Sequence, residues 1–156
     1  MTSKADFNAE EWATIAEAPL LAGVRVVAAE RGGAIRESIA MSKVYTAARE
    51  SQGASALLDE LVAAPPAVDP QRLKAGAGSD PSALSAERLR TAIQLLNEKA
   101  TPEDVSAYKQ FVLALAQAAA EAHKEGGFIG IGGKPISPKE QAALDELRAV
   151  LDGGGQ

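Results

Sequence analysis

Two helix starts and the glycine-rich segment between them, all within residues 101–151, constrain the fold of this chain most. Thr101 precedes a proline and two acids, an order typical of a helix N-terminus that has a capping hydroxyl and a favourable charge. Apolar residues then recur at spacings of three and four, which predicts one long helix with a buried face. They are Val105, Tyr108, Val112, Leu115, Ala119 and Ala122. Gly126 and Gly127 are expected to end this helix.

A second helix start follows at Ser137, where a capping hydroxyl, Pro138 and the capping-box residue Glu140 stand in order. Residues 128–136 between the two helices read Phe-Ile-Gly-Ile-Gly-Gly-Lys-Pro-Ile. Because this connection is short, the last helix is expected to fold back on the long one.

The N-terminal region contains another well-marked helix start. Asn8 is the expected cap, Glu11 is the reciprocal capping-box residue, and Phe7 can pack on Trp12 as a hydrophobic staple. Trp12 is therefore expected to be structural. Proline disfavours helical geometry in the residue before it, so Pro19 predicts a break and the start of a second helix.

Three further helices are predicted between residues 34 and 99, at 34–49, 54–63 and 83–99. Their apolar faces are expected to contain Ile35, Ile39, Met41 and Tyr45 in the first, Leu57, Leu58, Leu61 and Val62 in the second, and Leu84, Leu89, Ile93 and Leu96 in the third. Residues 65–82 are rich in Pro, Gly, Ala, Ser and Asp, which predicts a surface connection between two helical halves.

These elements predict an all-α fold, a compact bundle of about six helices in a single domain spanning residues 1–156. Aromatic residues make up only 4% of the chain, so alanine and aliphatic side chains must fill the core, and this favours closely packed helices. Both 28–33 and 122–127 end an alanine-rich helix with charged residues and two glycines. A twofold pseudo-repeat and two independent helix ends both explain this similarity.

Composition also excludes several classes of function. A formal net charge of -5 argues against nucleic-acid binding, which needs clustered Lys and Arg. The absence of cysteine excludes disulfides, thiolate metal sites and thiol nucleophiles. We find neither a secretory signal nor an apolar run long enough to be a transmembrane segment, and we expect a cytoplasmic protein.

The glycine-rich segment does not match the motifs that bind nucleotide phosphates. In a P-loop, Gly would occupy position 128 and a hydroxyl residue would follow Lys134, but these positions hold Phe128 and Pro135. The dinucleotide fingerprint that begins at Gly130 also fails at Pro135. Gly-x-Ser-x-Gly is absent as well. We therefore expect no cofactor and assign no catalytic residue.

The apolar side chains of this segment suggest contact with a partner instead. They either pack under the helices, as large apolar groups of soluble monomers usually do, or form a surface for a protein partner, with a peripheral membrane surface as an alternative. The candidate partner-binding residues are Phe128, Ile129, Ile131, Lys134 and Ile136.

A metal site is the alternative prediction. His123 is the only histidine, and Glu125 and Glu140 are carboxylates close to it in the sequence that could complete a set of ligands. The other reading of His123 is that it interacts with the last carbonyl groups of its helix.

Residues 83–151 resemble the TerB-like all-helical family, which is associated with tellurite resistance and bacterial stress responses. In that family a helix ends in Ala-Asp-Gly, and a short turn leads to a Ser-x-x-Glu helix start. The corresponding residues here are Glu125-Gly126 and Ser137 to Glu140, with residues 127–135 as an insertion. The resemblance implies a helical, bacterial, stress-related protein, in which Glu125 and Glu140 are the counterparts of an acidic metal-associated turn.

Taken together, these patterns predict a non-enzymatic interaction or accessory module that binds a protein partner through residues 126–136. A TerB-like stress protein that binds a metal ion or small ligand is the alternative. An enzyme with a site between its helices is a third class that the sequence leaves open, because helical bundles can contain such sites.

Overall fold

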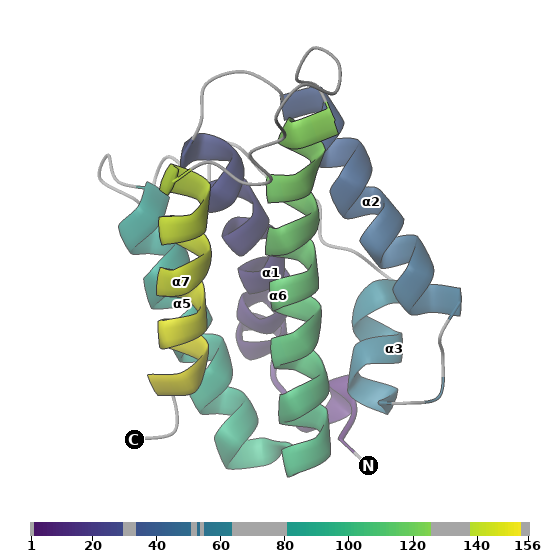
Figure 1. Cartoon of the computed structure of the whole chain (residues 1–156). Coiled ribbons are helices and arrows are strands. Elements are labelled where there is room, and N and C mark those ends of the chain that lie inside the picture. Colours follow the sequence, from purple (N-terminus) through teal and green to yellow (C-terminus); the bar gives the residue numbers. More distant parts are fainter. Residues whose placement is uncertain are drawn as a thin grey trace.

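The computed structural model describes residues 2–29, 34–50, 53, 55–63, 81–125 and 138–153. In this part of the chain a short 3-10 helix and six α-helices occur, with no strand, so the prediction of an all-α bundle is confirmed (Figure 1). The elements are η1 (Lys4–Asp6), α1 (Ala9–Ala29), α2 (Ala34–Glu50), α3 (Ala56–Ala63), α5 (Pro81–Lys99), α6 (Pro102–Glu125) and α7 (Pro138–Gly153).

The bundle is organised around two central helices, α1 and α6, which lie against each other and run in the same direction (Figure 1). Helices α5 and α7 pack on α1, whereas α2 packs on α6 and α3 packs against α2 and α6. We call the end of the bundle where α1 and α6 begin the lower end. The upper end is where α1 and α6 finish and where α2 and α7 begin (Figure 1).

The core consists mainly of aliphatic and alanine side chains, as the composition predicted. The predicted buried face of α6 is confirmed at Val105, Tyr108, Val112, Leu115 and Ala119, and the side chain of Ala122 lies outside the described part of the structure. Alanines of α1, α5 and α6 are also fully buried, including Ala18, Ala22, Ala92 and Ala116. Small side chains let the helix axes approach closely, and each fully buried aliphatic residue adds about 1.5–3 kcal/mol of stability. The larger members are Ile15, Leu57, Leu61, Leu89, Ile93, Leu96, Leu144 and Leu147.

The predicted break at Pro19 is wrong, because α1 continues through this proline from Ala9 to Ala29. A proline inside a helix removes the hydrogen bond to the carbonyl four residues earlier, which here belongs to Ile15. The hydroxyl of Tyr108 on α6 donates to that carbonyl oxygen at 2.8 Å, in a buried position. The neighbouring helix thus supplies the hydrogen bond that Pro19 removes.

The apolar face predicted for residues 34–49 is also only partly correct. Tyr45 is buried, but Ile39 is 53% exposed and lies outside the core. The two residues are six positions apart, which places them on different faces of a helix. Ile39 is the only large hydrophobic residue with an exposed side chain among the described residues.

Helix boundaries agree with the predictions within two residues for α3 and α5. Helix α5 begins at Pro81, inside the predicted connection 65–82, where proline occupies a favourable first helical position. Residues 64–80 lie outside the described part of the chain.

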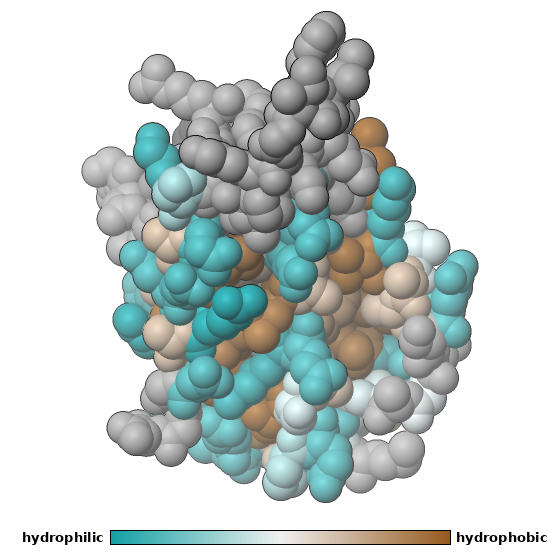
Figure 2. All heavy atoms as spheres, in the orientation of Figure 1, coloured by the Kyte–Doolittle hydropathy of each residue, from teal (hydrophilic) through white to brown (hydrophobic). Residues whose placement is uncertain are grey.

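On the face seen in Figure 2, polar residues form most of the outer surface of the helices. Apolar residues lie deeper, on both sides of α6, the front one of the two central helices. Partly buried apolar residues that pack against the core include Val44 and Ala48 of α2, Leu58 of α3 and Leu113 of α6. Over the described ranges, the helices lack a stretch with the length and hydropathy needed to cross a bilayer.

Candidate functional site

The predicted partner-binding residues Phe128, Ile129, Ile131, Lys134 and Ile136 all lie outside the described residues. The structure does describe the helices on both sides of them. Helix α6 ends at Glu125 and α7 begins at Pro138, close to the boundaries predicted from the sequence. Both of these helix ends lie at the upper end of the bundle (Figure 1).

The candidate metal ligands have backbones in the same region. His123 and Glu125 belong to the last turn of α6, and Glu140 belongs to the first turn of α7. Their side chains lie outside the described part of the structure. Among the side chains that are described, no group of three or more His, Asp or Glu residues is arranged to hold a metal ion.

The best-defined polar cluster lies at the lower end of the bundle and is centred on Asp104 of α6. Its Oδ1 accepts a hydrogen bond from the Ser55 hydroxyl at 2.6 Å, and its Oδ2 accepts one from the Thr101 hydroxyl at 2.9 Å. The backbone N–H of Thr2 also donates to Oδ2, at 3.4 Å. Asp104 therefore connects three segments that are distant in sequence, and its side chain is buried.

The same cluster caps two helices. The Thr101 hydroxyl accepts a hydrogen bond from the backbone N–H of Asp104 at 3.2 Å, which confirms Thr101 as the predicted cap of α6. The Ser55 hydroxyl accepts one from the Leu58 N–H at the start of α3, at 3.3 Å. Thr2 completes the cluster because its hydroxyl accepts a hydrogen bond from the Thr101 N–H at 3.2 Å.

Burial and hydrogen bonding act in opposite directions on the Asp104 carboxyl. Burial raises its pKa, but the hydrogen bonds from Ser55, Thr101 and Thr2 together outweigh this effect and lower the pKa below its usual value. Asp104 is therefore ionised at neutral pH, with both oxygens engaged by donors. This arrangement suits a fixed hydrogen-bond acceptor better than a proton donor in catalysis.

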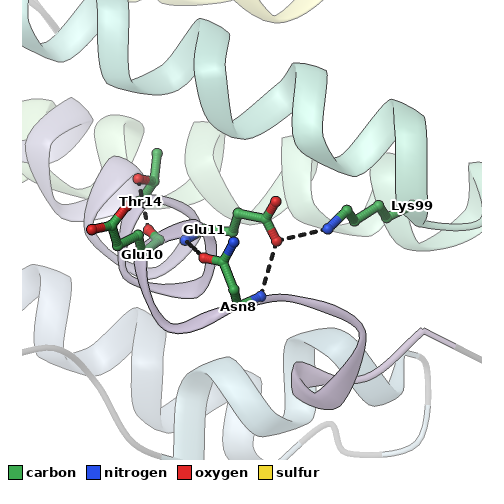
Figure 3. A network of polar contacts seen from close by, with 5 residues as sticks. All are labelled: Asn8, Glu10, Glu11, Thr14 and Lys99. Carbon is green, nitrogen blue, oxygen red and sulfur yellow. Dashed lines mark hydrogen bonds and ion pairs between the residues drawn. The ribbon is translucent and has the colours of Figure 1, made fainter.

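A second polar cluster at the start of α1 confirms the predicted capping box (Figure 3). The Glu11 N–H donates to the Asn8 side-chain oxygen at 2.9 Å, and the Asn8 N–H donates to the Glu11 carboxylate at 2.9 Å. Lys99, the last residue of α5, lies 2.7 Å from the same carboxylate oxygen. Hydrogen bonds from Lys99 and Asn8 lower the pKa of Glu11.

Aromatic side chains lie beside this second cluster. The rings of Phe7 and Trp12 are 6.2 Å apart between centroids, which confirms the predicted staple, and both residues are buried. The Lys99 ammonium lies 5.7 Å from the centre of the Phe7 ring, and the Lys4 ammonium lies 5.8 Å from the Trp12 ring. Such cation–π contacts add to the attachment of the N-terminal segment.

Helix α3 receives side-chain contacts from other elements at both ends. Asp104 of α6 orients its N-terminal Ser55, and the Arg49 side chain of α2 donates to the Val62 carbonyl in its last turn at 2.7 Å. The Glu60 carboxylate also accepts a hydrogen bond from the backbone N–H of Lys4. These contacts explain how a helix of only eight residues is stable, because isolated helices this short are marginal in water.

Sequence analysis predicted the local caps but missed the way they are connected. Asn8, Glu11 and Thr101 form standard short-range patterns, so they could be found from spacing alone. The contacts of Asp104 with Thr2 and Ser55 span 102 and 49 residues, and no local pattern signals them. The sequence pattern indicates Asp104 only as an acid that suits the helix dipole.

Comparison of the chain with family models, with curated proteins and with solved structures gives no match in any of the three. The resemblance of residues 83–151 to the TerB-like family stays a prediction.

Proposed function

We propose that this chain is a non-enzymatic interaction module that binds a protein partner through residues 126–136. The candidate contact residues are Phe128, Ile129, Ile131, Lys134 and Ile136. The observation that supports this proposal is that α6 ends and α7 begins at the same end of the bundle, the upper end (Figure 1).

The packing of the flanking helices adds to this support. The apolar faces of α6 and α7 are already buried in the bundle, with Leu115 and Ala119 on α6 and Leu144 and Leu147 on α7. The described apolar side chains therefore form a core among themselves. For the bulky residues of 126–136, which are joined by a backbone with five glycines, we propose an external contact.

A capture experiment tests this function. The tagged wild-type chain is used to isolate proteins from its native host, and any partner identified is then produced separately for a direct binding measurement. The double substitution Phe128→Ser and Ile131→Ser should abolish binding of that purified partner while the helical circular dichroism stays unchanged.

A control comes from Ile39, an exposed isoleucine of α2. Ile39→Ser replaces a surface apolar side chain with serine outside the proposed binding segment. This variant should bind the partner as the wild type does. Equal loss of binding in both variants, or loss of helical signal in the Phe128/Ile131 variant, contradicts the proposal.

A TerB-like protein that binds a metal ion is the second candidate. It is supported by the placement of the last turn of α6 and the first turn of α7 at one end of the bundle, because these turns contain His123, Glu125 and Glu140 (Figure 1). Calorimetric titration with Zn²⁺, Ni²⁺ and Mn²⁺ tests it. Binding that is lost in the His123→Ala variant supports this function, and no heat at millimolar metal removes it.

A further inference from the structure

Helix α1 is held by different contacts on the two sides of Pro19. The residues before it include Trp12 and Ile15, and the helix start is fixed by the capping box and by Lys99. The residues after it, 20–29, form what we call the upper segment of α1.

The upper segment contains two leucines, three valines, three alanines, Gly23 and Arg25. Among its described side chains Leu21, Ala22 and Val26 are buried, and Gly23 weakens a helix interior. Ala22 and Gly23 remove little apolar area from water, so they add less to the packing of this part of the helix than Trp12 and Ile15 add to the lower part. The Arg25 side chain forms an ion pair with Glu146 of α7, but Glu146 is 60% exposed, which limits the contribution of this pair.

The boundary between the two parts of α1 lies at Pro19, where the main-chain hydrogen bond to Ile15 is missing. The Tyr108 hydroxyl replaces that bond from outside the helix, and Tyr108 is itself fully buried. If the tyrosine hydroxyl were lost, the Ile15 carbonyl would be buried without a donor, and this is costly. Opening of the upper segment would expose that carbonyl to water and relieve the cost.

We propose that α1 is hinged at Pro19, and that the Tyr108 hydroxyl holds this hinge closed. The upper segment of α1 is then a conformational unit that opens separately from the lower part of the helix. The residues of the hinge, Ile15, Pro19 and Tyr108, belong to α1 and α6, so the hinge does not depend on the proposed function of residues 126–136.

Amide hydrogen exchange, resolved by residue with NMR at neutral pH, tests the hinge. In the Tyr108→Phe variant, the amides of residues 20–26 should exchange roughly tenfold or more faster than in the wild type. Amides of residues 12–18, and those in the middle of α5, should stay within about twofold of their wild-type rates.

Two further variants identify the cause of any change. The double variant Pro19→Ala with Tyr108→Phe gains a backbone N–H at position 19 that can donate to the Ile15 carbonyl, so the protection of residues 20–26 should return. Tyr45→Phe is the matched control, because the Tyr45 hydroxyl is buried but has no hydrogen-bond partner. This control should leave exchange in α1 unchanged.

Uniform acceleration along the whole of α1 would overturn the hinge, since it would mean that the helix opens as one unit. Unchanged rates in Tyr108→Phe, or failure of Pro19→Ala to restore protection in the double variant, would also overturn it. If Tyr108→Phe does not fold, Pro19→Ala alone should slow exchange of residues 20–26 relative to the wild type, and no slowing contradicts the proposal.

Discussion

The two ends of the bundle are constructed differently. At the lower end, side chains from one element complete the helix termini of another, through Asp104, Lys99 and Glu11. At the upper end, α6 and α7 flank residues 126–137, five of which are glycine. The lower end is thus specified by directional polar contacts between distant segments. We therefore expect substitutions at the lower end to cost more stability than substitutions in residues 126–136, for which we propose binding.

The largest effect should come from the centre of the lower end. Asp104→Ala removes the acceptor of three hydrogen bonds and should lower the free energy of unfolding by about 3 kcal/mol, because buried donors are left unsatisfied. Urea unfolding measures this change. Glu103→Ala is the matched control, since it removes an exposed acid from the same helical turn and should cost only about 0.5 kcal/mol. Equal losses in the two variants would show that Asp104 acts through its charge alone.

Acid should weaken the lower end in a way that depends on Asp104. The pKa of this carboxyl is lower in the folded chain than its ordinary 3.8, so its stabilising contribution is present at neutral pH. That contribution is lost as the pH falls below about 4 and through the lowered folded value. The urea midpoint of the wild type should therefore fall more between about pH 5 and pH 2 than that of Asp104→Asn. Parallel pH profiles would contradict this assignment.

The cap of α1 should contribute less than the Asp104 cluster. Asn8→Ala removes the side-chain acceptor for the Glu11 N–H and should cost about 1 kcal/mol in urea unfolding. Asn8→Ser retains a side-chain oxygen at the cap and should stay close to the wild type. A loss of stability in the serine variant as large as in the alanine variant would mean that the cap oxygen is not the cause.

The smallest effect on stability is expected at the upper end. Phe128→Ser with Ile131→Ser should change the free energy of unfolding by less than about 0.5 kcal/mol if both side chains face outwards. A pair of apolar side chains buried in the core would instead cost about 2 kcal/mol or more each. Urea unfolding of this variant beside Asp104→Ala therefore tests the proposed difference between the two ends directly.

The parts of the fold that could be predicted from the sequence are those set by interactions between residues a few positions apart. The caps at Asn8 and Thr101 and the buried face of α6 follow from spacings of three and four residues, and they are confirmed. Local patterns predict a break at Pro19 because the residue that compensates for it, Tyr108, forms its hydrogen bond with Ile15 across 93 positions of the chain. A tertiary contact overrode the local preference.

The candidate site could be predicted only in part. The ends of the flanking helices, at Glu125 and Pro138, follow from glycine and proline signals and agree with the structure. The orientation of Phe128 and Ile131 depends on contacts that no periodic pattern specifies, and these residues lie outside the described part of the chain. Their role as a contact surface therefore stays a prediction.

The contacts at both ends of α3 imply an order of events during folding. The N-terminal end of this helix is completed only when Asp104 of α6 is in place, and its C-terminal end only when Arg49 of α2 is in place. We expect α3 to form late, after the transition state, with φ-values near zero for substitutions such as Leu61→Ala. The eight-residue helix would then affect how fast the chain unfolds much more than how fast it folds.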